Sequence, residues 1–250
     1  MNSRNRSDSV DAPSHGETLQ DRFTSDEVYL RAVKTAEEEI TRSFRPLFLS
    51  GIAAGLTAGA SLLASFPVRS ALSETPAATI VGAAFYGLGF VFIIIGRYQL
   101  FTENTITPVM LALHRKCTLP QLFRLWGIVL AGNLVGAALV ALMLHLSDVF
   151  SEESSALLIE TARASMSEST NRLFWTSVFA GALVGTMAWL SLAVRENTAR
   201  IILILLIAFV IPIAHLHHCV FGSAETLYAV FRAAAAPLDY PRFLALTVLG

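Results

Sequence analysis

Three histidines and a cysteine lie close together after a long apolar stretch: His215, His217, His218 and Cys219. Imidazole and thiolate are good ligands for zinc or copper, so one hypothesis is a membrane metal-binding protein or metalloenzyme that uses this cluster. However, adjacent residues seldom converge on one ion, and no second group of ligands is evident in the apolar part of the chain. A second hypothesis needs only one histidine. With a pKa of roughly 6.5, an imidazole can donate a hydrogen bond or a proton near neutral pH.

A second polar stretch, from Gly96 to Thr105 (GRYQLFTENT), follows an apolar run earlier in the chain. The residues after it, Ile106 to Leu113, are apolar again but too few to cross a membrane alone. The stretch could be a plain loop, or a non-helical turn between a spanning helix and a half-helix. Irregular backbone at membrane depth is tolerated only where protein buries it or a cavity hydrates it. The second interpretation therefore predicts that protein buries this stretch or that a cavity hydrates it.

Composition explains where these residues must lie. The chain has 250 residues, of which 54% are hydrophobic and 15% charged, and its mean hydropathy is +0.58. A soluble domain carries about 25% charged residues, so a lipid bilayer is the expected solvent for most of this chain. The net charge of -1 gives no reason to expect nucleic acid as a partner. The two cysteines suggest no disulfide framework, and no arrangement of nucleophile, base and orienting group predicts an enzyme.

Polarity divides the chain into three parts. Residues 1–24 are predicted to be a disordered polar tail, and residues 25–43 an amphipathic cytoplasmic helix or, alternatively, a plain linker. Residues 44–250 form the predicted transmembrane domain, in which the complete apolar segments approach the roughly 20 residues that cross a ~30 Å hydrocarbon core. The six segments are Phe44–Ala64, Ala77–Ile95, Leu119–Leu146, Leu173–Val194, Ile201–Leu216 and a sixth that begins near Phe243 and is incomplete at Gly250.

Charge distribution predicts the orientation. Cytoplasmic loops carry an excess of Lys and Arg, and basic residues gather near positions 42–45, 114–124 and 195–200. The segment 147–170 is acidic instead, and we expect it to be a loop on the opposite side. No signal peptide is predicted, because the first 45 residues contain no apolar core segment. The N-terminus is therefore predicted to be cytoplasmic.

The second polar interruption resembles the first. Pro212 removes a helical hydrogen bond, Gly222-Ser223 permits a turn, and Leu227 to Ala236 is again a short apolar segment. Broken helices in both halves of a membrane protein point to inverted repeats with a binding site at the midplane. The predicted fold is an all-α membrane protein with six transmembrane helices in two inverted three-helix repeats, the second and fifth helices being broken.

At these residues the chain resembles the formate/nitrite transporter family. Gln99-Leu100-Phe101-Thr102 is similar to that family's Glu-Leu-Phe-Thr loop in the broken second helix. Gly132-Asn133-Leu134-Val135-Gly136 is similar to its Gly-Asn motif in the third helix, and His218 falls at its pore histidine. The family's usual loop Glu is Gln99 here, and its Glu before the histidine is His217. The match is closest to a divergent branch of bacterial inner-membrane members.

The resemblance implies an aquaporin-like fold, a homopentamer with one pore per subunit, and transport of small weak-acid anions such as formate or nitrite, possibly with protons. His218 would donate a proton or hydrogen bond to the anion, and Thr102 would hold either the ligand or the imidazole. The alternatives are a buried histidine that packs the break and a loop-stabilising hydroxyl. Gly132, Asn133 and Gly136 are predicted to be structural, and no metal or cofactor is predicted. Two apolar constrictions are expected from Phe90, Leu100 and Phe101 on one side and from Tyr86, Ile211 and Phe221 on the other, unless these side chains are ordinary packing.

Overall fold

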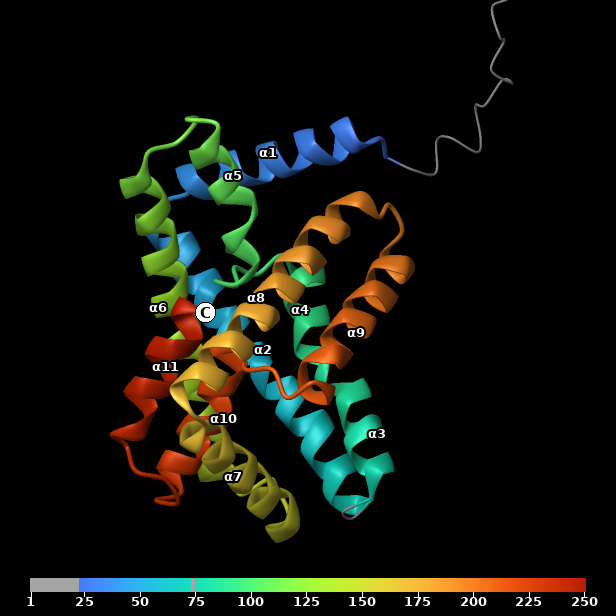
Figure 1. The fold of residues 1–250 in the computed structure, drawn as a ribbon, viewed down its shortest axis with the longest axis vertical. Coiled ribbons are helices and arrows are strands. Elements are labelled where there is room, and N and C mark those ends of the chain that lie inside the picture. The colour runs from blue at the N-terminus through green and yellow to red at the C-terminus, as the bar shows by residue number, and fades with distance from the viewer. Residues whose placement is uncertain (1–22, 73–74) are drawn as a thin grey trace, which may run out of the picture.

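The described residues of the computed structural model, 23–72 and 75–250, fold into helices and contain no β-strand (Figure 1). The predicted tail lies almost wholly outside this part of the chain. The helices are α1 (Ser25–Thr41), α2 (Phe44–Ala71), α3 (Pro76–Tyr86), α4 (Leu88–Gly96), η1 (Glu103–Thr105), α5 (Thr107–Leu113), α6 (Leu119–Ser147), α7 (Glu152–Ser167), α8 (Thr170–Ala193), α9 (Asn197–Ile213), α10 (Cys219–Phe231) and α11 (Asp239–Leu249).

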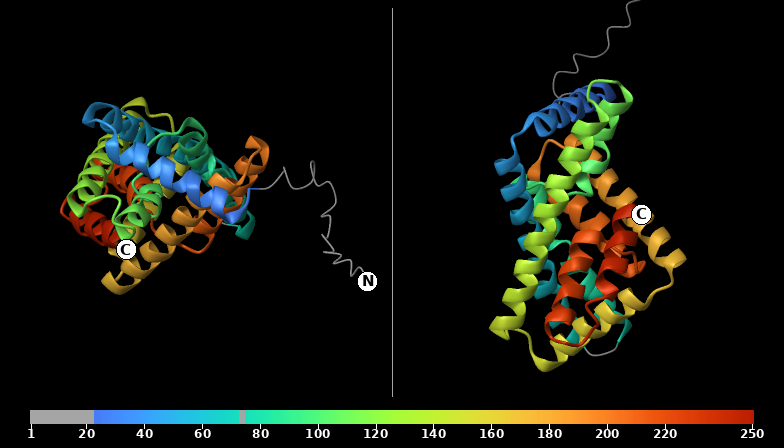
Figure 2. Two further views of the ribbon diagram at one scale, coloured as in Figure 1. Left: turned by 90° about the horizontal axis from the view of Figure 1, so that it is seen from above. Right: turned by 90° about the vertical axis from the view of Figure 1, so that its left-hand side faces the viewer.

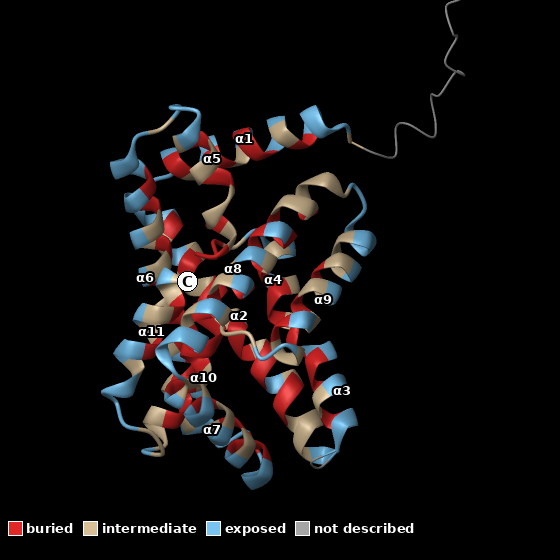
Figure 3. Ribbon diagram, viewed as in Figure 1, coloured by how far each residue is buried: buried red, intermediate tan, exposed pale blue. Residues whose placement is uncertain are grey.

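Four helical stretches are long and apolar enough to cross a membrane, namely Phe44–Ala71, Pro76–Gly96, Leu119–Ser147 and Thr170–Ala193. α9 and α10 are apolar but shorter, with 17 and 13 residues. The stretch Pro76–Gly96 changes direction at Gly87, where α3 passes into α4. Large apolar side chains are exposed along the outer faces of these helices, as expected where lipid rather than water is the neighbour (Figure 3).

α2 and α6 form the most extensive helix pair, and glycines permit their close approach. A Cβ atom at Gly136 would lie 2.8 Å from the Cα of Gly55, and one at Gly132 would lie 3.1 Å from the Cα of Gly51. Small residues at membrane helix interfaces let two backbones approach in this way. The Gly-Asn motif therefore lies where α6 packs on α2.

The two interruptions share one capping geometry. α4 is followed by Arg97 at φ 54°, and Tyr98 N donates to Ile93 O. α9 is followed by His215 at φ 52°, and Leu216 N donates to Ile211 O. Left-handed residues with this bond pattern satisfy the last carbonyls of a helix. The chain thus leaves both helices through the same type of C-cap.

The short helices after the interruptions end alike as well. Arg115 follows α5 at φ 57° and Ala233 follows α10 at φ 53°. After each of them, the next backbone N–H donates to the carbonyl five residues earlier, as it does after Arg97 and His215. The left-handed positions in the first half (97 and 115) and in the second half (215 and 233) therefore have equal spacing.

Two details of the predicted organisation are wrong. The acidic segment 147–170 is not simply a loop but contains α7, whose buried face (Ser155, Leu158, Ala162, Met166) packs on the bundle. The second interruption covers only the residues between α9 and α10, because Gly222 and Ser223 lie inside α10. There Gly222 makes room for the ring of Phe243, whose Cζ would lie 2.6 Å from an added Cβ.

α1 lies across one end of the bundle (Figure 2). Its Glu39 reaches the first interruption, where Gln99 Nε2 donates to Glu39 Oε1 at 3.3 Å. The other carboxylate oxygen of Glu39 is buried and has no hydrogen-bond partner among the described residues. Burial raises the pKa of Glu39 from 4.5 to about 7.

This raised pKa predicts that α1 docks more weakly as pH rises. A carboxyl with a raised pKa in the docked state stabilises that state fully below its ordinary pKa, and the stabilisation is lost as pH rises through about 7. We expect hydrogen exchange of the α1 amides, corrected for intrinsic rates, to be faster at pH 8 than at pH 5. Glu39→Gln should remove this difference, whereas Glu38→Gln, at an exposed neighbour, should leave it. Equal protection of wild-type α1 at both pH values would contradict the prediction.

Candidate functional site

The two interruptions meet at a buried hydrogen bond between Thr102 and His218. Thr102 Oγ1 and His218 Nε2 lie 2.9 Å apart, and the two residues are 7% and 3% exposed. One comes from the segment between α4 and η1 and the other is the N-cap of α10. The structure therefore brings together the two polar residues that the sequence singled out.

The other ring nitrogen of His218 fixes its hydrogen-bonding role. His218 Nδ1 accepts from the backbone N–H groups of Val220 and Phe221 at 3.2 and 3.3 Å, and so caps α10. Because Nδ1 is an acceptor here, the proton of the neutral imidazole is on Nε2. Nε2–H then donates to Thr102 Oγ1, and the Thr102 hydroxyl proton remains free to donate to a ligand.

Aromatic rings surround His218 on one side. Phe90 and Phe221 stack at 4.1 Å between ring centroids, and both present an edge-to-face contact to the His218 ring at 5.4 and 5.1 Å. Tyr86 lies against both phenylalanines. Phe90 and Phe221, which the sequence analysis assigned to different constrictions, are thus in direct contact. Ile211 is also buried, and it lines a cavity, described below, on the α7 side of His218.

Asn133 holds the first interruption in place. Its Oδ1 accepts from Phe101 N at 2.8 Å, and its Nδ2 donates to Gly51 O at 2.9 Å and to Gln99 O at 2.8 Å. Leu100 and Phe101 are buried beside it. One α6 side chain thus satisfies two backbone groups of the interruption, Gln99 O and Phe101 N, and also ties them to Gly51 of α2.

Replacement of Asn133 by Ala should strongly destabilise the fold. It leaves Phe101 N and Gln99 O without this partner, and each unsatisfied buried group costs about 1–3 kcal/mol. We expect a much lower apparent melting temperature in detergent than for the wild type. Asn104→Ala is the matched control, because the Asn104 side chain makes one hydrogen bond, to Gln99. A similar small loss for both variants would show that Asn133 does not hold the interruption.

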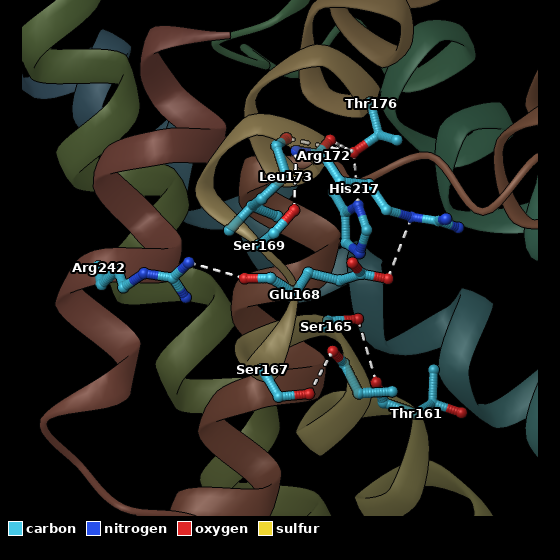
Figure 4. Close-up of polar contacts among 11 residues, drawn as sticks. Thr161, Ser165, Ser167, Glu168, Ser169, Arg172, Leu173, Thr176, His217 and Arg242 are labelled. Atoms are coloured by element: carbon cyan, nitrogen blue, oxygen red, sulfur yellow. Dashed lines mark hydrogen bonds and ion pairs between the residues drawn. The ribbon is translucent and has the colours of Figure 1, made fainter.

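A cavity of about 480 Å³ opens next to His218 on the side where α7 lies, and we call it the vestibule. Figure 4 shows part of its wall, where His217 points toward Thr176 and Glu168 lies beside Arg172. The Thr176 hydroxyl and His217 Nδ1 are 2.7 Å apart, and Arg172 Nε is 3.1 Å from Glu168 Oε1. His217, adjacent to His218 in sequence, therefore has its own partner on α8.

The metal hypothesis finds no support in the described residues, which contain no group of three histidine, cysteine or acidic side chains arranged to hold an ion. His217 bonds to Thr176 and His218 bonds to Thr102, so the two rings face different partners. Cys219 is buried as a free thiol.

Two vestibule residues were missed or misjudged in the sequence. Arg69 lay at the end of an apolar segment and gave no signal of function. Glu225 had no predicted role, although its spacing from His218 places both on one face of a helix once α10 is known. The cavity that joins them is lined from α2, α3, α7, α8, α9, α10 and α11, and no local pattern predicts it.

Two helix interruptions therefore meet at a buried, hydrogen-bonded histidine within an apolar helical bundle. The chain belongs to the formate/nitrite transporter family, whose sequence model matches residues 26–250. The match agrees with the resemblance seen at Gln99–Thr102, Gly132–Gly136 and His218.

Two proteins of similar sequence support this assignment. The chain is 36% identical to the inner membrane protein YfdC of Escherichia coli over 78% of its own length and 63% of that protein, so it spans less than two thirds of that relative. It is 22% identical to the formate channel FocA of Haemophilus influenzae, over 69% of this chain and 62% of FocA.

Solved structures show the same fold. An FNT family ion channel superposes with a TM-score of 0.81 and 20% identity, over 90% of this chain and 92% of the other. A pentameric formate channel with formate bound superposes with a TM-score of 0.66 and 19% identity, over 86% and 81%.

Proposed function

We propose that this chain is a subunit of a channel or transporter for small monovalent weak-acid anions in a bacterial inner membrane. The observation that carries the proposal is the buried Thr102–His218 pair at the junction of two helix interruptions. Moving an anion from water into an apolar passage costs several kcal/mol unless the anion is hydrogen-bonded or neutralised. The Thr102 hydroxyl proton is a donor beside the rings of Phe90 and Phe221, and His218 Nε2–H can donate either to Thr102 or to the anion.

The proposed passage runs between the aromatic group at His218 and the first interruption. Phe90, Phe221 and Tyr86 would form one apolar constriction with Ile211, and Leu100 and Phe101 the other. These side chains are too apolar to stabilise a charge, so the species that passes them would be close to neutral. The anion would therefore cross together with a proton.

The membrane topology is part of the proposal. Six spans in two inverted repeats are supported by the equal spacing of the left-handed caps in the two halves. A cytoplasmic N-terminus is supported by the basic residues near α1 and in the segment between α8 and α9. A homopentamer is supported by the exposed apolar faces of the bundle and by the pentameric structural neighbour.

Uptake into proteoliposomes tests the function. The reconstituted full chain would be offered formate, nitrite, hydrosulfide, acetate and chloride between pH 5 and pH 8. We expect uptake of one or more of the weak-acid anions, faster at lower pH, and no uptake of chloride, which cannot be protonated in this range. Equal rates in protein-containing and empty vesicles for every anion would contradict the proposal.

A further inference from the structure

The vestibule wall carries an acidic side chain in line with His218. His218, Gly222 and Glu225 are spaced at i, i+4 and i+7 around α10, and all three line the vestibule. Residues with this spacing lie on one face of a helix. The ring of Phe243 fills the place of a side chain at Gly222, so His218 and Glu225 communicate through the cavity that both line and not by direct contact.

A guanidinium faces the same cavity from α2. The stem of Arg69 lies against Gly82, where any Cβ would overlap it, and its guanidinium lies 5.1 Å from the ring centroid of Phe66. Arg69 and Glu225 are half-buried and line the same cavity, but they are not in ion-pair contact. Among the described residues, neither side chain forms a hydrogen bond. A half-buried guanidinium without a partner is a ready site for a planar anion.

His218 itself is poorly suited to supply a proton. Its Nδ1 accepts two backbone N–H groups, so a proton on Nδ1 would break the cap of α10. Its Nε2–H can donate a hydrogen bond to Thr102 or to a ligand, but loss of that proton would leave an imidazolate. A weak-acid anion that must become neutral therefore needs another acid on its way to His218.

We propose that Arg69 and Glu225 form an anion-protonation site in the vestibule, which supplies neutral acid to His218. Arg69 binds the anion, and the protonated carboxyl of Glu225 transfers its proton to an oxygen of that anion. The O–H bond of Glu225 breaks as an O–H bond forms on the ligand. The resulting Glu225 carboxylate is stabilised by Arg69 and takes a new proton from water at the vestibule mouth. This inference rests on the proposed function and names the residues that neutralise its substrate.

The other charged or titratable groups in the vestibule are less suited to this step. Glu168 is paired with Arg172, and His217 bonds to Thr176. Tyr86 is buried between phenylalanine rings and is a much weaker acid than a carboxyl. The remaining groups are His215, in the interruption, and Glu160, an exposed carboxyl on α7.

Formate uptake by reconstituted full chains, measured from pH 5 to pH 8, tests the site. Glu225→Gln cannot donate a proton, so we expect its uptake at pH 7 to fall about a hundredfold. The deficit should shrink toward pH 5, because more formate is then protonated in solution. Glu160→Gln is the matched control and should keep the wild-type pH profile. A wild-type profile for Glu225→Gln, or equal deficits in both variants, would overturn the inference.

Arg69 is tested by the concentration dependence of uptake. Arg69→Gln should raise the half-saturating formate concentration about tenfold or more, while Arg69→Lys, which keeps the charge, should recover part of that loss. An unchanged half-saturating concentration in Arg69→Gln would overturn its role. If the wild type takes up no formate, the proposed function fails by itself. The site is then judged by formate binding in a thermal-shift titration, where an equal response of wild type and Arg69→Gln would overturn it.

Discussion

His218→Asn should nearly abolish anion uptake while the protein remains folded. The asparagine Oδ1 can replace Nδ1 as the cap of α10, but the shorter side chain has no donor at the position of Nε2. Without this donor an oxygen of the ligand is left unsatisfied at a buried site, which costs about 1–3 kcal/mol, so we expect uptake to fall about five- to a hundredfold. Initial rates of formate uptake into proteoliposomes measure this.

The complementary variant is His218→Gln. Its side-chain amide can place a donor near the position of Nε2, but it does not reproduce the cap at Nδ1. We expect more residual uptake than in His218→Asn together with a lower melting temperature, because loss of an N-cap costs about 0.5–2 kcal/mol. If Asn and Gln variants lose uptake only in proportion to their loss of folded protein, His218 packs the interruption and does not contact the anion.

Gly136→Ala should prevent stable folding. An added Cβ would overlap Ile52 O and would lie 2.8 Å from Gly55 Cα, so the backbones of α2 and α6 would have to separate. Overpacking a tight core costs about 1–3 kcal/mol, and contacts with backbone cannot be relieved by a side-chain rotation, so we expect the upper end or more. Asn133 lies on the same helix and would move with it, so the first interruption would be lost as well.

The matched control is Gly127→Ala on the same helix. No atom lies within 4 Å of a Cβ at Gly127, and replacing a helical Gly by Ala in open space stabilises a helix by about 1 kcal/mol. The two substitutions should therefore shift the melting temperature in detergent in opposite directions. A stable Gly136→Ala protein would mean that α2 and α6 do not approach as closely as the structure shows.

The interrupted helices could be predicted from the sequence because their polar residues have no place in a lipid-facing helix. Gln99 to Asn104 interrupts an apolar run, and that run resumes for only a few residues afterwards. The end of the second interruption could not be placed, because Gly222 and Ser223 look like turn residues. In the structure Gly222 accommodates the ring of Phe243, and the Ser223 hydroxyl donates to Cys219 O inside α10. Both uses depend on neighbours that the local sequence does not reveal.

α7 shows a different limit. Its acidic residues predicted a loop, although Ser155, Leu158, Ala162 and Met166 have the spacing of a buried helical face. The periodicity of these four residues predicts the helix, whereas the acidic charges predict a loop that does not form. The pairing of Thr102 with His218 was predicted by way of the family resemblance, whereas the Arg69–Glu225 arrangement was not. These two residues come from distant helices, and only the folded bundle places them in one cavity.

The most direct test of the account is the number of protons that cross with each anion. Formate uptake into proteoliposomes would be recorded together with internal pH and membrane potential, using the full chain and no imposed gradient other than formate. The account predicts that one proton enters with each formate ion and that no potential develops, because the species that passes Phe90 and Phe221 is neutral. Formate uptake that generates a potential without proton entry would contradict it.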